Sequence, residues 1–474
     1  MTTELLRLMP GVFTATAQDG AVHLVRWPHR EPLGHLTDAQ RSTLHTLAAG
    51  PCHPDQLRAG STLVNRLRAR GWLVVEVTDA GHPLYALRPV RPASPQFRPA
   101  SPQFRPLSSH FGTANSAAGN GDSRAGNGDS RLSRFAMLRR DGDECVLQSP
   151  RAWCEISVLD PRVCAVLGML TVPRSAAELG EWLPAPAAAR LLADLRWAGL
   201  AVPAGDAEDT ELRLCQWSPH DLWFHEQTRL GTRFPVAGRP VGATYWAEGR
   251  FPPPPARRDP FPGPVITLPR PDLAAVADPP LSTVLESRRT IRAHDDDHPM
   301  DLAQLGEFLY RTARVRAVIP KDDDDQLDRP FPSAGSLHEL DLYLAVRHVA
   351  GLEPGLYHYD GHDHALRSVC PSNSAVRRLL GDAAAGAELP AAPQLLIVLA
   401  ARFARVMWKY QALSYALILK NVGVLYQLMY TVATAMGLAP CALGTGDSAA
   451  FTEATGLDPL EECSVGEFIL GSRP

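Results

Sequence analysis

Two tandem duplications divide the first half of this 474-residue chain. A proline-rich heptad at 91–97 is repeated unchanged at 98–104, and a glycine-rich heptad at 118–124 is repeated at 125–131. Sequences of this composition bury too little apolar surface to form a packed core. We therefore expect a disordered linker over 91–134, with a folded segment on each side of it.

The segments on the two sides of the linker resemble each other. The sequence LRARGWLV at 67–74 is echoed by LRWAGLAV at 195–202. In the first segment, a capping box at Thr37 begins a series of three short helices, which a strand hairpin follows. Three helices and a hairpin are typical of a winged helix. We predict a duplicated winged-helix-like module, at 1–90 and at 135–205.

Bulk composition excludes several classes of function. The net charge is −4, with 45% apolar and 21% charged residues, which is typical of a soluble globular protein and argues against a dedicated nucleic-acid binder. Eight cysteines include no C-x-x-C motif, which favours free thiols in a reducing compartment over disulfides or a zinc site. The first residues lack a basic region followed by an apolar run, so we expect no secretory signal and a cytoplasmic location.

One apolar segment, 422–443, has the composition of a membrane span. It contains Gln427 and Pro440 and lacks aromatic or basic flanks on both sides. A helix that is apolar all round is more often the central helix of a large domain. We expect a buried helix here and no contact with a membrane.

The remainder of the chain predicts one large domain. A helix from 219 to about 230 and four prolines at 252–255 form a connector over 206–262. Beyond it, helices and strands mix without strict β-α-β order, which favours an α+β fold over 263–474, with a central, mostly antiparallel sheet flanked by helices. The expected strands are 340–346, 355–359, 365–369, 395–400 and 465–470, and the expected long helices are 302–313 and 411–436.

An arginine-rich cluster in this domain is a candidate phosphate site. Arg288, Arg289, Thr290 and Arg292 combine guanidinium groups with a hydroxyl, which together match the oxygens of a phosphate. For an isolated Arg-Arg-Thr sequence, an ordinary charged helix end is the simpler interpretation. Here the cluster is predicted at a helix-to-strand junction, where an anion site is geometrically natural.

Two other segments are candidates for redox chemistry. Lys409 and Tyr410, next to Trp408, offer two titratable groups that can move a proton, although such a pair at a helix start is usually surface. The small-residue loop from Pro332 to Gly335 lets backbone amides approach a planar ring closely, and a simple turn is the alternative.

Two further patterns carry less weight. The G-x-G-x-x-A sequence at 444–449 is followed by too few residues for a dinucleotide-binding unit. Histidines 358, 362 and 364 surround a predicted hairpin turn at irregular spacing, so we expect no metal site there.

Taken in this order, the cluster at 288–292, the loop at 332–335 and the segment at 408–410 resemble those of the SagB/ThcOx-type dehydrogenases, in the flavin-dependent nitroreductase superfamily. The resemblance covers 265–474 closely and 206–250 loosely. It implies a homodimer with FMN at the interface. It also implies that the N-terminal modules are peptide clamps or degenerate clamps, because longer family members carry related modules.

The resemblance assigns a role to each candidate residue. It places Lys409 and Tyr410 at the chemistry, as the base that removes a proton from the substrate. Family members often have proline where Glu339 stands, so the shape of the preceding loop stays open. The residues assigned to FMN are Arg288, Arg289, Thr290, Arg292 and the C-terminal Arg473 at the phosphate and ribityl tail, Pro332, Ser333, Ala334 and Gly335 at the edge of the isoalloxazine ring, and Leu443, Gly444 and Thr445 in a loop that closes over the flavin.

The function that the resemblance implies is azoline oxidation. Thiazolines or oxazolines in a ribosomally made precursor peptide would become thiazoles or oxazoles, with oxygen reoxidising the flavin. The precursor peptide is the expected partner, and a cyclodehydratase complex is a further one. Two alternatives stay open: an NAD(P)H-dependent nitro- or quinone reductase, and a non-catalytic scaffold that binds peptide or, less favoured, DNA.

Overall fold

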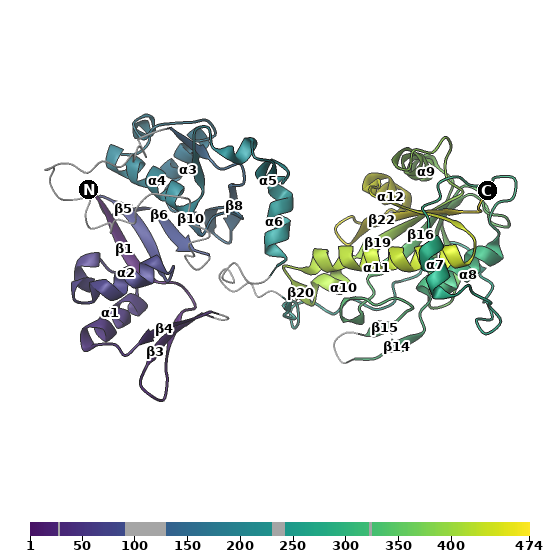
Figure 1. Cartoon of the computed structure of the whole chain (residues 1–474), viewed down its shortest axis with the longest axis horizontal. Coiled ribbons are helices and arrows are strands. Elements are labelled where there is room, and N and C mark those ends of the chain that lie inside the picture. The colour runs from purple at the N-terminus through teal and green to yellow at the C-terminus, as the bar shows by residue number, and fades with distance from the viewer. Residues whose placement is uncertain (27–28, 91–128, 230–241, 322–324) are drawn as a thin grey trace. The chain divides into compact units, whose positions relative to one another are not determined.

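The computed structural model describes residues 1–26, 29–90, 129–229, 242–321 and 325–474, and the protein divides into two compact units, Met1–Pro240 and Val241–Pro474 (Figure 1). Most of the predicted linker, 91–128, lies outside the described residues. Each unit has its own sheet and its own core. They are described separately below.

The N-terminal unit is built on one antiparallel sheet rather than on two separate modules. Strand β6 of the first half pairs with β10 of the second half, with Leu87 opposite Ile156. The predicted modules at 1–90 and 135–205 therefore contribute to one shared sheet and one shared core. The strand order is β1 (Thr2–Leu8), β5 (Leu73–Asp79), β6 (His82–Pro89), β10 (Cys154–Val158), β9 (Glu144–Gln148) and β8 (Met137–Asp141).

The two halves of this unit nevertheless repeat the same order of helices. In both halves, an α-helix, a 3₁₀ helix and a second α-helix follow one another, and Thr37 closes the predicted capping box with Gln40. The winged-helix assignment stays a prediction. The helices are α1 (Asp38–Ala49), η1 (Pro54–Gly60) and α2 (Ser61–Ala69) in the first half, and α3 (Pro161–Met169), η4 (Glu178–Glu181) and α4 (Ala185–Ala198) in the second.

The repeated sequence motif forms the same helix end in both halves. Gly71 has φ +78° and Gly199 has φ +80°, the left-handed conformation that favours glycine after a helix. The N–H of Trp72 donates to the carbonyl of Leu67 at 2.9 Å, and the N–H of Leu200 donates to that of Leu195 at 2.8 Å. The sequence echo therefore reflects a repeated local structure.

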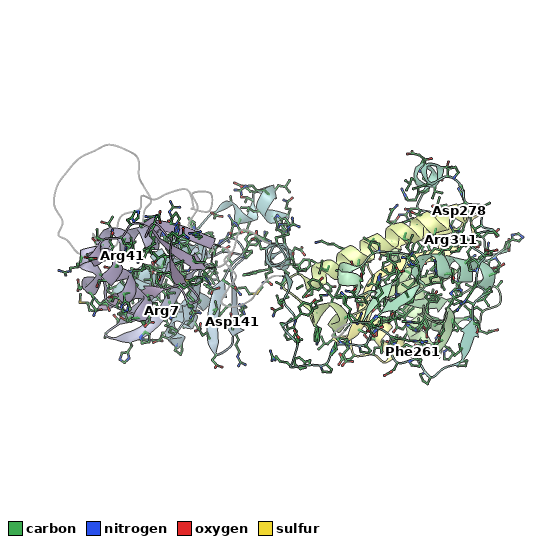
Figure 2. The ribbon with its side chains drawn as sticks, turned by 90° about the horizontal axis from the view of Figure 1, so that it is seen from below. Arg7, Arg41, Asp141, Phe261, Asp278 and Arg311 are labelled. Atoms are coloured by element: carbon green, nitrogen blue, oxygen red, sulfur yellow. The ribbon has the colours of Figure 1, made fainter. Side chains whose placement is uncertain are left out.

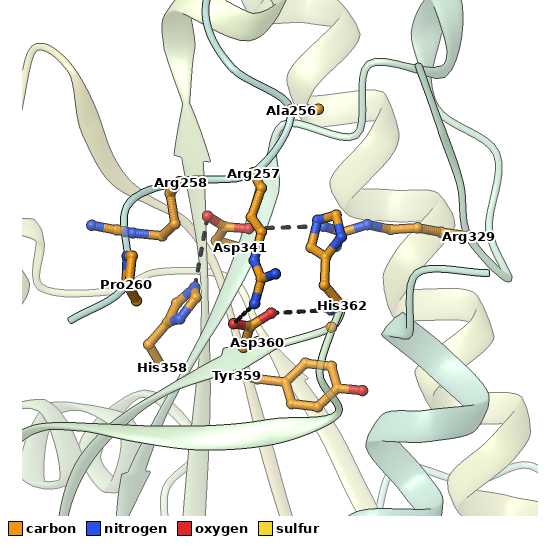
Figure 3. Close-up of a pocket in the computed structure, with 11 residues that line it drawn as sticks. Ala256, Arg257, Arg258, Pro260, Arg329, Asp341, His358, Tyr359, Asp360 and His362 are labelled. Atoms are coloured by element: carbon orange, nitrogen blue, oxygen red, sulfur yellow. Dashed lines mark hydrogen bonds and ion pairs between the residues drawn. The ribbon is translucent and has the colours of Figure 1, made fainter. Parts of the chain in front are cut away.

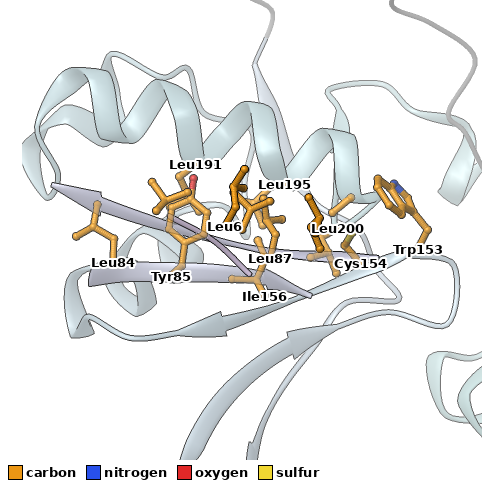
Figure 4. Close-up of a cluster of buried hydrophobic side chains, with 14 of the residues drawn as sticks. Leu6, Leu84, Tyr85, Leu87, Trp153, Cys154, Ile156, Leu191, Leu195 and Leu200 are labelled. Carbon is orange, nitrogen blue, oxygen red and sulfur yellow. The ribbon is translucent and has the colours of Figure 1, made fainter. Parts of the chain in front are cut away.

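Helix α4 packs on the shared sheet (Figure 4). Leu191 and Leu195 of this helix lie over Leu87 and Ile156 of the sheet, and all four are buried. The hydroxyl of the buried Tyr85 donates to Asp194 at 2.8 Å, so this polar group is satisfied inside the core.

Several small elements of this unit were not predicted. Strand β7 (Ser130–Leu132) pairs with β11 (Ala201–Pro203), so the second half begins within the segment that we assigned to the linker. The unpredicted three-stranded sheet contains β2 (Phe13–Thr16), β3 (Val22–Arg26) and β4 (His29–Gly34), and the unit ends with η5 (Ala207–Asp209), α5 (Leu212–Cys215) and α6 (Pro219–Gln227).

The C-terminal unit has the predicted α+β architecture. Its seven-stranded sheet is antiparallel at every pairing, and helices cover both faces. The sheet order is β13 (Val265–Thr267), β18 (Ala365–Pro371), β17 (Gly355–Asp360), β16 (Leu340–Val346), β19 (Leu395–Arg402), β22 (Glu462–Gly471) and β21 (Ala439–Leu443). The α-helices are α7 (Leu281–Ser287), α8 (Leu302–Ala313), α9 (Ser374–Gly386), α10 (Phe403–Met407), α11 (Ser414–Ala435) and α12 (Ser448–Thr455).

The two faces of this sheet have separate cores. Helices α8 and α11 pack on the face that carries Leu342 and Leu344, whereas α9 and α12 pack on the face that carries Tyr343 and Ala345 (Figure 1). An ion pair of 2.6 Å joins Asp278, which precedes α7, to Arg311 of α8 (Figure 2).

The apolar segment at 422–443 is not one helix. Helix α11 ends at Ala435, Gly437 turns the chain with φ +69°, and β21 begins at Ala439. Among the described helices, α11 alone has the length and apolar composition to cross a membrane. Its Ile418, at 0% exposure, belongs to the core against the sheet.

The proline-rich connector belongs partly to the C-terminal unit. Strand β12 (Gly242–Ala243) pairs with β20 (Tyr410–Gln411), and the carbonyls of Pro254 and Pro255 accept hydrogen bonds from arginines 405 and 402. The compact C-terminal unit therefore begins at Val241, within the predicted connector. Three short elements complete the unit: β14 (Ala317–Ile319), β15 (Gln326–Asp328) and η6 (Ala334–Ser336).

Candidate active site

The structure brings the predicted loop and the predicted catalytic pair into contact. Gly335 has φ +62°, and a Cβ atom built on it would lie 2.9 Å from Oη of Tyr410 and 3.4 Å from Nζ of Lys409. Only glycine leaves this space open in this backbone conformation. Gly335, Lys409 and Tyr410 therefore form one site, although 74 residues separate Gly335 from Lys409 in the sequence.

A buried carboxylate holds the loop against α11. Glu339 is 0% exposed and accepts a hydrogen bond from Nδ2 of Asn421 at 2.8 Å and one from Oγ of Ser333 at 3.2 Å. Oδ1 of Asn421 accepts from the N–H of Ala334 at 3.4 Å. Burial raises the pKa of Glu339. The residue that departs from the resembled family is thus the anchor of the loop.

Lys409 lies between two aromatic rings. Its side chain is 8% exposed, and Nζ is 5.1 Å from the ring centroid of Tyr245 and 5.8 Å from that of Tyr410. Among the described residues, no carboxylate lies within 4.0 Å of this ammonium group. The rings therefore supply its nearest favourable electrostatic contacts, as cation–π pairs.

The local structure around Lys409 differs from the prediction. Trp408 caps the short helix α10, and Lys409 leads into strand β20, so the pair does not begin a helix. The carbonyl of Lys409 accepts hydrogen bonds from the N–H groups of Thr244 and Tyr245, at 2.9 and 3.0 Å. The connector thus fixes the backbone of the segment that carries Lys409.

The arginine cluster lies at the other end of α11. Arg288 caps α7, and its guanidinium group is 5.4 Å from the ring centroid of Tyr430. Oγ1 of Thr290 is 3.1 Å from the hydroxyl of the same tyrosine. The predicted helix-to-strand junction is wrong, because an irregular segment follows α7, and Ile291 bonds the edge strand β21 through Pro440.

The C-terminus lies beside this irregular segment. Oγ of Ser472 donates to the carbonyl of Asp295 at 2.8 Å, and the N–H of Gln394 donates to Nδ1 of His294 at 3.2 Å. Arg473 therefore follows a residue that is bonded to the segment containing Arg292. Within the described part of the chain, Arg288, Arg289, Arg292 and Arg473 form no ion pair with a carboxylate, although Nη1 of Arg289 donates to the carbonyls of Glu286 and Arg288. Their charges are therefore not neutralised and can attract a phosphate.

The third predicted segment, Leu443 to Thr445, is positioned by strand β21. Leu443 pairs with Glu467 of β22, and the buried carboxylate of Glu467 packs directly against Gly446. Thr445 lies close to Gly386 of α9, on the sheet face opposite α11. The structure therefore does not place this loop in contact with the Gly335 site within one chain.

The two main clusters are separated along α11. Asn421 holds the loop, and Tyr430 contacts Thr290, so at about 1.5 Å of rise per residue the clusters lie roughly 13 Å apart along the helix axis. Arginines without a carboxylate partner at one cluster and the Gly335 loop beside Lys409 and Tyr410 at the other are placed to contact the phosphate and the planar ring of an elongated ligand. These donors suit FMN.

A separate polar cavity of about 20 Å³ lies on the sheet face opposite α11 (Figure 3). Asp341 and His358 line it, and Oδ2 of Asp341 and both ring nitrogens of His358 lack a hydrogen-bond partner. This volume and these groups suit an ordered water. No group of three His, Cys, Asp or Glu residues in the described ranges is arranged to hold a metal ion.

Sequence reasoning missed three residues that build the site: Tyr245, Asn421 and Arg405. Arg405 is 1% exposed, and it donates to the carbonyl of Leu337 at 2.9 Å and to that of Pro254 at 2.8 Å. The adjacent aromatics at 245 and 246, in a segment of glycine and proline, were the one available signal. Asn421 and Arg405 lie within ordinary helical patterns and gave none.

Comparisons with known proteins match both units. Residues 130–233 match the cyanobactin oxidase ThcOx, and residues 285–471 match the nitroreductase family. MJ1384 of Methanocaldococcus jannaschii, which is named as a nitroreductase, is 26% identical over 182 residues, 38% of this chain and 85% of MJ1384. The microcin B17-processing protein McbC of Escherichia coli is 29% identical over 122 residues, 24% of this chain and 44% of McbC.

A solved structure, the E. coli microcin synthetase McbBCD complex with truncated pro-MccB17 bound, aligns with a TM-score of 0.34 and 21% identity, covering 51% of this chain and 91% of the matched chain. The nitroreductase match spans every strand of the seven-stranded sheet except β13, together with the loop at 332–335 and the arginines at 288–292. The ThcOx match lies in the N-terminal unit. The protein is therefore an FMN-dependent oxidoreductase that is similar to the SagB/ThcOx-type dehydrogenases of the nitroreductase superfamily.

Proposed function

We propose that this protein oxidises azoline rings in a ribosomally made peptide to azoles, thiazolines to thiazoles or oxazolines to oxazoles. The observation that carries the proposal is the contact of Lys409 and Tyr410 with the glycine of the loop at 332–335. The name of McbC, a microcin-processing protein, supports a peptide substrate.

The oxidation removes one hydrogen of the ring as a proton and a second with two electrons. FMN, when bound, accepts the two electrons, and dioxygen is the proposed final acceptor. Lys409, as the neutral amine, takes the proton from the ring carbon, and Tyr410, whose hydroxyl lies beside Gly335 with Nζ of Lys409, is the group that relays it towards solvent. The buried Trp408 excludes water from the base on one side.

For the cofactor, we propose that Arg288, Arg289, Thr290, Arg292 and Arg473 hold the phosphate. The loop from Pro332 through Ser333 and Ala334 to Gly335 offers its backbone to the ring edge. Leu443, Gly444 and Thr445 do not contact this loop within one chain, so their role depends on a second copy of the chain.

We propose that this second copy covers the exposed apolar face of α7 and α11. Leu281 and Leu285 of α7 are 66% and 49% exposed, and Tyr415, Leu419 and Val424 of α11 are 41%, 39% and 38% exposed. A homodimer formed there would place FMN at the interface.

The N-terminal unit is the proposed site of contact with the precursor peptide. Its strands β1 and β8 are the edges of the six-stranded sheet, and an extended leader peptide can add to such an edge. A cyclodehydratase complex is a further proposed partner. All eight cysteines are free thiols, in keeping with the cytoplasm as the proposed location.

Mass spectrometry of an azoline-bearing peptide tests the proposal. We expect the FMN-loaded protein to remove two mass units per ring, and we expect Lys409→Ala to retain FMN and to lose this activity. The exposed Lys321→Ala variant is the matched control and should act like the unmodified protein. Full activity of Lys409→Ala would refute the mechanism.

The match to MJ1384 favours one other candidate, an NAD(P)H-dependent nitroreductase. Rapid oxidation of NADPH with a nitroaromatic acceptor, unaffected by Lys409→Ala, would support that candidate instead. Slow oxidation of NADPH together with loss of two mass units from the peptide would exclude it.

A further inference from the structure

Three exposed aromatic side chains gather beside the catalytic lysine. Tyr245 and Trp246 are each 38% exposed, and Phe251 is 53% exposed. We call these three residues the aromatic cap. They lie between 233 and 285, a stretch that neither family match covers.

The cap is fixed to the segment that carries Lys409. Its Tyr245 lies edge-on to Trp408, with ring centroids 6.2 Å apart, and Trp246 lies edge-on to Phe251 at the same separation. Nε1 of Trp408 donates to the carbonyl of Phe251 at 3.0 Å. The rings are therefore held in place before any substrate arrives, which lowers the entropic cost of binding.

The backbone of the cap is itself constrained. Tyr245 has φ +51°, a conformation that tyrosine rarely adopts, and its N–H donates to the carbonyl of Lys409 at 3.0 Å. Strained backbone that persists is typical of functional sites. The strain places the Tyr245 ring 5.1 Å from Nζ of Lys409.

The exposed surface of the cap is suited to a planar ring. The only polar group of the Trp246 side chain, Nε1–H, already donates to the carbonyl of Met407, so its ring offers only apolar and π surface. Aromatic faces of this kind stack on flat heterocycles. A substrate ring must also come within a few ångströms of Lys409 to lose its proton.

We propose that the aromatic cap is the subsite that holds the five-membered heterocycle of the peptide substrate against Lys409. This inference rests on the proposed function, because it takes an azoline peptide as the ligand. The inference adds that the protein recognises the planar ring of the peptide, and the residues next to that ring, by stacking. Tyr245 is also a positioning residue, since its ring faces the ammonium group of Lys409.

A binding measurement tests the cap without any turnover. The probe is a short synthetic peptide that carries one thiazole ring, compared with the same peptide carrying cysteine in place of the ring, and the readout is quenching of tryptophan fluorescence in the full-length protein. We expect the thiazole peptide to bind about tenfold more tightly. Equal affinities for the two peptides would overturn the proposal.

Variants locate the subsite. Phe251→Leu and Trp246→Leu should remove most of the preference for the ring and raise KM for the azoline peptide about tenfold. Phe251 donates no side-chain hydrogen bond, so its variant removes only contacts of the ring, which include those with Trp246 and Arg250. Leu460→Ala, at an apolar residue that is 86% exposed, is the control and should change neither quantity.

Two outcomes separate this proposal from the one that it rests on. If the unmodified protein removes two mass units per ring but Phe251→Leu and Trp246→Leu keep its KM, the cap proposal is wrong and the proposed function stands. If Trp246→Leu converts a dimer into a monomer in sedimentation, the cap is a subunit contact and the subsite proposal is also wrong.

Discussion

The substitution Gly335→Ala tests whether the position of the Tyr410 hydroxyl affects the reaction rate independently of the stability of the fold. The added methyl group would lie 2.9 Å from Oη of Tyr410, whereas ordinary van der Waals contact begins near 3.4 Å. The tyrosine hydroxyl must therefore retreat by about 0.5 Å. Nζ of Lys409, at 3.4 Å, already lies at contact distance and need not move.

The magnitudes predict a larger loss of rate than of stability. An alanine at φ +62° costs roughly 1–2 kcal/mol in the free energy of unfolding, because its Cβ atom disfavours the left-handed region. Misplacing a reacting group by about 1 Å costs about 100-fold in rate, so a displacement of about half that distance should lower kcat about tenfold. Bound FMN, measured by its visible absorbance, should not change.

Two controls make this prediction decisive. Gly456→Ala introduces the same strain at φ +70° with no atom within 4 Å, so it should destabilise the protein by a similar amount and leave kcat unchanged. In a Tyr410→Phe background the displaced hydroxyl is absent, so Gly335→Ala should cost no further rate. A normal kcat for a folded Gly335→Ala protein, or a full tenfold loss in the Tyr410→Phe background, would refute the reasoning.

Three other perturbations test the site and its support. Burial lowers the pKa of His338 to about 3, so this histidine takes up a proton near pH 6.5 only in the unfolded state. The free energy of unfolding should therefore fall by about 2 kcal/mol between pH 7 and pH 5. Denaturant titrations of His338→Asn should not show this fall. Arg292→Ala should weaken FMN binding about 10- to 100-fold and riboflavin binding less than about twofold by fluorescence titration, since only FMN carries the phosphate; equal losses would argue against a phosphate contact. Asn421→Leu removes a donor from the buried Glu339 and should cost about 2–3 kcal/mol in the free energy of unfolding, part of which Glu339→Leu in the same chain should restore.

The sequence predicted those parts of the C-terminal unit in which local pattern and tertiary environment agree. Helix α8 and strand β16 have the predicted bounds, 302–313 and 340–346, because one has a capped amphipathic pattern and the other a continuous apolar run. Strand β21 was missed because Pro440 interrupts it and because its neighbours continue the apolar pattern of α11. Pro440 is tolerated because β21 is the edge strand of the sheet, where proline costs no ladder hydrogen bond.

Candidate site residues that lie close together in the sequence could be predicted, whereas contacts between residues far apart in the sequence could not. Arg288, Thr290 and Arg292 lie within five residues, so their chemistry is visible in the sequence. The bond between Glu339 and Asn421 joins residues 82 positions apart, and no spacing rule anticipates it. The separation of the Thr445 loop from the Gly335 site is likewise a property of the sheet, because β21 directs its end towards α9.

Helix α11 sets the distance between the two clusters. Near its start, Asn421 bonds the loop that faces Tyr410, and near its end, the hydroxyl of Tyr430 contacts Thr290 and accepts the N–H of Ala442 at 2.8 Å. A helix is a stiff spacer, so neither cluster can move along it without breaking these bonds. A ligand that contacts both the arginines and the Gly335 site must therefore extend roughly 13 Å along the axis of α11. Movement of a loop does not change this distance, because the helix sets it.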